Sequence, residues 1–139
     1  MEALLIFAIE LGALIGVDVT PKEAIMFKIM CVESAGKEQK WHADNQSWGL
    51  FGLTKKTAKW LEVNLGDTPK EQYDSAEKYL DKMIDKCEGN LINAAGCYHS
   101  KNYREKLRYE DKLDEVKPED YPEAVEVFKS IINQKHSEE

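Results

Sequence analysis

The most apolar stretch inside the chain is AIMFKIMCV at positions 24 to 32, in which Lys28 is the only polar residue. A helix made of these residues would leave no face for water, so the pattern predicts a central helix that is buried nearly all round. Three residues ahead of it form a helix start. Thr20 can cap the free amides, Pro21 suits the first helical position, and Glu23 can complete a capping box.

A second helix start repeats the same tetrapeptide, TPKE, at positions 68 to 71. Beyond it, apolar side chains recur at three- and four-residue spacing, which predicts an amphipathic helix that ends before Gly89. These side chains belong to Tyr73, Ala76, Leu80, Met83, Ile84 and Cys87. We expect this helix to pack against the central one.

The N-terminal segment MEALLIFAIELGALIGV is also strongly apolar. It lacks the basic region and cleavage pattern of a signal peptide, and Glu10 interrupts a run shorter than the roughly 20 residues that span hydrocarbon. We therefore predict an additional, buried N-terminal helix within residues 1–19 and no stable membrane span. A weak, releasable membrane anchor is the alternative.

The remaining segments complete a helical pattern. Helices are expected from Asn90 to Tyr98 and from Pro122 onward, and no alternating run is long enough to predict a strand. Residues 36–53, GKEQKWHADNQSWGLFGL, contain three glycines and two tryptophans and are expected to form a loop of the kind that carries function. The predicted fold class is all-α, with at most a minor irregular or β loop, in one domain over 1–139.

Charge narrows the range of partners. The formal net charge of −7 disfavours nucleic acid, since such binding depends on Lys and Arg neutralising phosphates. The mixed stretch KNYREKLRYEDK at 101–112 is interpreted as a solvated helix face or loop.

The three cysteines show no zinc-ligand spacing, and an odd number cannot pair completely within one chain. We interpret them mainly as small, buried apolar residues. A bridge between Cys87 and Cys97 is the alternative if the protein works outside a reducing cytosol.

Glu33 places a carboxyl at the end of the apolar run, in IMCVESAG. The negative end of the helix dipole and apolar neighbours both raise the pKa of such a group. A carboxylic acid that keeps its proton near neutral pH can protonate a departing oxygen, as in glycoside cleavage. The alternative is an ion pair between Glu33 and a lysine, with Lys28, Lys37 and Lys40 as candidates.

Three segments in order resemble the signature of the lytic transglycosylases and goose-type lysozymes. They are ESAG (33–36), SWGLFGLTKKTA (47–58) and NLINAAGCYHS (90–100). The resemblance covers residues 20–103 and implies a lysozyme-like helical domain, with 104–139 as a further C-terminal helical part. It also implies cleavage of peptidoglycan between N-acetylmuramic acid and N-acetylglucosamine, without a cofactor or metal.

The resemblance assigns roles to individual residues. Glu33 falls on the catalytic acid/base, and Tyr98 falls on the tyrosine beside it. The block that lines the sugar groove falls on Ser47, Gly49, Leu50 and Phe51. The product would be an anhydro sugar if the proton comes from the sugar's own 6-hydroxyl, or an ordinary hydrolysis product if it comes from water.

Asp44 is the candidate for a second carboxylate that would hold this water, with an Asx turn at Asn45 as the alternative. Three departures from the family pattern are present. Gly52 stands where the family usually has Gln, and His99 stands where it usually has Asn. Ser100 and Lys101 replace the common Ala-Gly.

Aromatic residues suit the apolar faces of sugar rings, and the candidates are Trp41, Trp48, Phe51, Tyr98 and Tyr103. Trp60, inside an expected helix, is interpreted as a core residue. A metal site from His42, Asp44 and His99 has no recognised ligand spacing, so none is predicted.

The expected partner is the glycan strand of the cell wall, in the periplasm or outside the cell, and the protein is expected to be a monomer. With no visible signal peptide, the expected routes are phage delivery, other secretion machinery or removal of a leader. The rival interpretations are a catalytically inactive glycan-binding module and a helical interaction protein.

Overall fold

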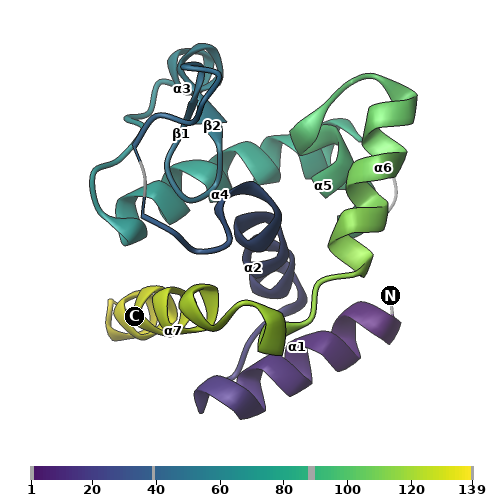
Figure 1. Ribbon diagram of the computed structural model, residues 1–139, viewed down its shortest axis with the longest axis vertical. Helices are drawn as coiled ribbons and strands as arrows, with labels where there is room; N and C mark the ends of the chain where they lie inside the picture. Colours follow the sequence, from purple (N-terminus) through teal and green to yellow (C-terminus); the bar gives the residue numbers. More distant parts are fainter. Residues whose placement is uncertain (1, 39, 88–89, 139) are drawn as a thin grey trace.

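The computed structural model describes residues 2–38, 40–87 and 90–138 (Figure 1). Its elements, in chain order, are α1 (Glu2–Ile15), α2 (Pro21–Ser34), β1 (Ser47–Trp48), β2 (Leu53–Thr54), α3 (Lys55–Leu61), α4 (Pro69–Lys86), α5 (Leu91–His99), α6 (Tyr103–Asp114), the 3-10 turn η1 (Pro118–Asp120) and α7 (Pro122–Ser137). Helices dominate the described part of the chain, as the sequence predicted.

Helix α2 is the centre of the molecule. It contacts α1, α5, α6 and α7, and Figure 1 shows it enclosed by the other helices. Every residue from Ala24 to Cys31 is buried, Lys28 included. The Lys28 ammonium donates a hydrogen bond to the Leu113 carbonyl at 3.0 Å, which offsets the cost of burying a charge. The predicted central helix is confirmed.

Both TPKE segments form the predicted helix starts. Thr20 and Thr68 each accept a hydrogen bond from the backbone amide three residues on, and Glu23 and Glu71 each complete a capping box. The apolar stripe of α4 is buried at Tyr73, Ala76, Leu80 and Met83. The predicted helices that follow Asn90 and begin at Pro122 are present as α5 and α7.

The loop after α2 carries the small amount of β-structure. Strands β1 and β2 pair antiparallel, with Ser47 opposite Thr54 and Trp48 opposite Leu53. Trp41 adds an isolated bridge to Trp48, and their rings meet edge to face at 4.7 Å. The Trp48 indole also donates to the Gly66 carbonyl, so this loop is fixed to the segment before α4.

The prediction that α1 is buried is only half right. Leu4, Ala8, Leu11 and Ile15 pack into the core, but Leu5, Ile6, Ile9 and Leu14 lie on the opposite face and are exposed, Ile9 by 63%. Because α1 rests on α2 with one side only, its all-round apolar pattern did not mean all-round burial. Within residues 2–38, 40–87 and 90–138, every helix is too short or too polar to cross a membrane.

The prediction for Trp60 is wrong. This residue lies in α3, a two-turn helix at the surface, and is 51% exposed. The mixed stretch at 101–112 lies mostly in α6, which agrees with the expected helix face. Tyr109 within it is buried, however.

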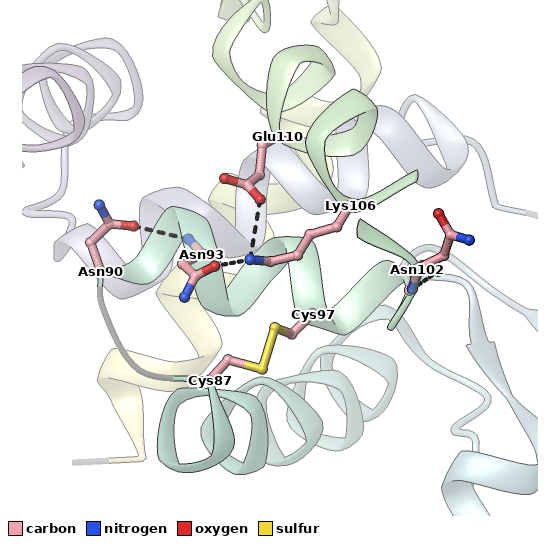
Figure 2. The surroundings of a disulfide bond; sticks show 8 residues. Cys87, Asn90, Asn93, Cys97, Asn102, Lys106 and Glu110 are labelled. Atoms are coloured by element: carbon pink, nitrogen blue, oxygen red, sulfur yellow. Dashed lines mark hydrogen bonds and ion pairs between the residues drawn. A yellow bond between two sulfur atoms is a disulfide. The ribbon is translucent and has the colours of Figure 1, made fainter. Parts of the chain in front are cut away.

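Cys87 and Cys97 form a disulfide. For these two residues the interpretation as simple apolar side chains is therefore wrong, and the alternative of a bridge holds. The bond joins the C-cap of α4 to the last turn of α5 (Figure 2). Cys31 keeps a free thiol in the core, as expected.

Candidate active site

Glu33 lies in the last turn of α2 at the wall of a groove with a volume of about 380 Å³. The helix stops there because Ala35 takes a left-handed conformation, and the Ser34 hydroxyl donates to the Leu50 carbonyl at 2.8 Å. The groove is also lined by His42, Asp44, Ser47, Gly52, Leu53, Thr54, Thr57, Tyr79, Tyr98 and His99. Four separate segments of the chain therefore line one groove.

Burial raises the pKa of Glu33 above its ordinary value. The opposing influences are a hydrogen bond from Tyr109 and the more distant positive charges of His42 and Lys112, and they do not cancel the effect of burial. The Tyr109 hydroxyl donates to Oε2 of Glu33 at 2.8 Å. The arrangement favours a protonated carboxyl held in a fixed orientation.

Sequence reasoning missed Tyr109. It contacts Glu33 from α6, 76 positions away in the chain. Its ring stacks on the His99 imidazole, with centroids 4.3 Å apart and planes 2° from parallel, and burial lowers the pKa of His99. A usable signal was present, because Tyr109 and Leu113 share the i, i+4 spacing of a buried stripe within the otherwise polar stretch.

The turn between β1 and β2 is held from two sides. The Tyr98 hydroxyl donates to the Phe51 carbonyl at 2.8 Å, and the Leu50 amide donates to the Gln72 side chain at 2.8 Å. Of the residues predicted to line a sugar groove, Ser47 and Tyr98 line the groove that contains Glu33, whereas the side chains of Leu50 and Phe51 are buried in the core.

Two glycines in this turn are required by geometry. Both Gly49 and Gly52 have positive φ, of 71° and 63°. A Cβ on Gly49 would overlap the Gln72 amide, and a Cβ on Gly52 would overlap Oε1 of Glu33. Any other residue at position 52 would be strained at this positive φ, and its Cβ would force the Glu33 carboxyl to shift.

Asp44 lines the same groove but has a different electrostatic environment. Its Oδ1 accepts hydrogen bonds from the amides of Gln46 and Ser47, and its Oδ2 accepts one from the Ser47 hydroxyl. These bonds hold the pKa of Asp44 below its ordinary value. The groove therefore contains one carboxyl that tends to stay protonated and one that stays ionised.

In the described parts of the chain, no group of three or more His, Cys, Asp or Glu side chains is arranged to hold a metal ion. His42, which faces the groove, donates through Nε2 to the Gly49 carbonyl at 2.6 Å.

A sequence model of the Transglycosylase SLT domain matches residues 19–117. The chain belongs to the SLT transglycosylase family. The match confirms the resemblance seen in the sequence and the lysozyme-like helical fold class. Comparisons with curated proteins and with solved structures gave no match.

The SLT region contains every residue that lines the groove, together with Tyr109, while α1 and α7 lie outside it. The SLT family consists of lytic transglycosylases that act on cell-wall peptidoglycan. Two of the three departures expected from the sequence, Gly52 and His99, lie near the acid. Gly52 abuts Oε1 of Glu33, and His99 stacks on the tyrosine that holds Oε2.

Proposed function

We propose that the protein cleaves the glycan strand of peptidoglycan at the β-1,4 bond between N-acetylmuramic acid and N-acetylglucosamine, with Glu33 as the general acid/base. The observation that carries the proposal is a carboxyl with a raised pKa, fixed by Tyr109, at the wall of a groove in an SLT domain. We further propose that residues 1–139 act as a single domain.

In the first step, protonated Glu33 gives its proton to the bridging oxygen as the glycosidic bond breaks. The substrate's own acetamido group stabilises the sugar cation. Glu33, now a carboxylate, then takes a proton from the acceptor. The hydrogen bond from Tyr109 suits both stages, since a hydroxyl donor stabilises the carboxylate that forms and still orients the acid.

The acceptor decides the product. Attack by the sugar's own 6-hydroxyl gives an anhydro sugar and needs only Glu33. Attack by water gives hydrolysis, for which ionised Asp44 is the candidate to hold the water. Asp44 already accepts three hydrogen bonds from Gln46 and Ser47, and the chain belongs to a transglycosylase family, so we propose the anhydro route as the main reaction.

Substrate contacts are proposed for the loop and α5. Ser47 and Tyr98 offer side chains within the groove, and Gly49, Leu50 and Phe51 contribute the backbone of the turn whose shape Tyr98 fixes. The site of action is the cell wall, and delivery by phage lysis or entry machinery is one route that fits this activity.

The test is incubation of wild type and Glu33→Gln with insoluble peptidoglycan, followed by mass analysis of the soluble products. We expect release by wild type and none by Glu33→Gln, with products one water lighter than hydrolytic ones. Glu126→Gln, at an exposed site on α7, is the matched control and should release as wild type does.

Other outcomes identify the rivals. Binding of wild type to peptidoglycan without release would indicate an inactive glycan-binding module. Neither binding nor release would indicate a helical interaction protein. Equal release by wild type and Glu33→Gln would remove Glu33 from the mechanism.

A further inference from the structure

Trp60 is a large aromatic side chain that the core does not use. It lies in α3 with 51% of its surface exposed. Its ring meets the Tyr79 ring edge to face, at 6.5 Å and 89°, and the Lys86 ammonium lies over one face of the indole, 4.4 Å from its centroid. The indole is thus held in place by two neighbours from α4 while much of it still reaches solvent.

An aromatic row connects this indole to the groove. Tyr79, the neighbour of Trp60, lines the groove that contains Glu33. On its other side the Tyr79 ring packs against the Tyr98 ring at 4.8 Å, and Tyr98 lines the groove as well. Trp60 therefore extends the aromatic wall of the groove outward over α3.

The helix that carries Trp60 is basic up to its C-cap Glu62, although the whole chain carries a net charge of −7. Helix α3 contains three lysines, Lys55, Lys56 and Lys59, and no acidic residue. Lys86 adds a fourth ammonium directly at the indole. A flat apolar ring beside ammonium groups suits a sugar whose substituents carry carboxylates, because the ring face stacks and the charges pair.

We propose that Trp60 and Lys86 form a second substrate-contact site, in which a sugar of the glycan strand stacks on Trp60 and a carboxylate of its peptide stem pairs with Lys86. This site, called the Trp60 platform, lies outside the groove that surrounds Glu33. The inference rests on the proposed function, because it takes peptidoglycan as the polymer that occupies the groove.

Binding is measured in the Glu33→Gln background, where no turnover intervenes, by sedimentation with two insoluble or polymeric probes. One is intact peptidoglycan, and the other is glycan strands freed of their peptides by an amidase. Adding Trp60→Ala should weaken binding to both probes about fivefold, the size of effect that one aromatic contact gives. Adding Lys86→Met should weaken only binding to intact peptidoglycan, by about threefold.

Matched controls come from remote sites. Ile9→Ala also removes an exposed apolar side chain, from α1, and should leave binding unchanged. Lys129→Met removes an exposed lysine from α7 and is the control for Lys86→Met. Helix α7 is joined to the start of α4 by the Lys70–Glu138 ion pair, whereas Lys86 lies at the other end of α4. Trp60→Tyr keeps an aromatic platform and should retain most of the binding, which separates loss of stacking from loss of folding.

With Glu33 intact, Trp60→Ala should raise KM for peptidoglycan and leave kcat unchanged, because Trp60 lies outside the groove that holds Glu33. Unchanged binding of Trp60→Ala to both probes would overturn the inference. If Lys86→Met weakened binding to both probes equally, the carboxylate contact would be removed from the inference. Failure of the proposed function has a different signature, namely no product from wild type while the Glu33→Gln protein still binds.

Discussion

Loss of the Cys87–Cys97 disulfide should lower the free energy of unfolding substantially. The bond closes a loop with a sequence separation of 10 between α4 and α5. In the chain-entropy account, a cross-link over about 10 residues removes about 2.7 kcal/mol of unfolded-state entropy at 25 °C. For a chain of 139 residues, that loss corresponds to a fall in Tm of about 9 °C.

The disulfide also lies next to the groove. Cys97 directly precedes Tyr98 and His99, which line it. Figure 2 shows Lys106 of α6 reaching Asn93 and Glu110, and this contact ties α5 to the helix that carries Tyr109. Loosening α5 should therefore reduce cleavage as well as stability, since the Tyr98 hydrogen bond to Phe51 fixes the turn against Glu33.

The assay is urea unfolding followed by tryptophan fluorescence, comparing oxidised protein, protein in reductant, and Cys87→Ala/Cys97→Ala. With an m-value of about 2 kcal/mol/M, the midpoint should fall by roughly 1 M in both the reduced protein and the double variant. The control is the double variant with and without reductant. Its midpoint should not move, because only the buried thiol of Cys31 remains.

Coincident midpoints for oxidised and reduced wild type would refute the reasoning. That result would mean either that the bond does not form or that the unfolded chain is already compact over this loop. Free-thiol titration of the unfolded oxidised protein distinguishes the two, with one thiol expected when the bond is present and three when it is absent.

Three further predictions concern the acid and its neighbours. Because burial raises the pKa of Glu33, the free energy of unfolding of wild type should fall as pH rises from the pKa of an unfolded glutamate, about 4.3, through the folded pKa. The stability of Glu33→Gln relative to wild type should therefore grow between pH 4 and pH 7. Thermal melts at both pH values measure this, and an advantage that stays constant would contradict it. Tyr109→Phe removes the donor that lowers the pKa of Glu33, so the alkaline limb of the pH–rate profile should move to higher pH, and kcat should fall about tenfold. A profile that keeps its shape would show that this hydrogen bond does not act on the acid. Gly52→Ala should abolish product release and lower stability by at least about 1 kcal/mol, because the added methyl group meets Oε1 of Glu33 at a positive φ. Full activity of that variant, measured by product mass, would show that the turn is free to rearrange.

Local patterns predicted much of the helical framework. The two TPKE starts, the central helix and the stripe of α4 follow from capping chemistry and periodicity within a few residues, and these are properties that a short segment carries with it. Glu33 was recognisable for the same reason, since its position at the end of an apolar helix is visible in a single octapeptide. The extent of the domain, 1–139, stays a prediction.

Exposure was less predictable than helix formation. An apolar segment such as α1 forms a helix whether one face or both are covered, and Trp60 lies in a helix too short to show which side faces the core. Cys87 and Cys97 gave no decisive signal either, because bond formation depends on how α4 and α5 pack.

The sequence by itself determined the helices, their starts, and the acid at the end of the central one, because capping and periodicity act over a few neighbouring residues. Only the tertiary structure decided what surrounds that acid. Tyr109 and Gly52 reach Glu33 from distant segments, and His99 stacks on Tyr109 from a third. These contacts exist because α5, α6 and the turn after β1 pack around the end of α2. The pKa of Glu33, and with it the proposed chemistry, depends on this packing, since desolvation is a property of the assembled core and not of any one segment.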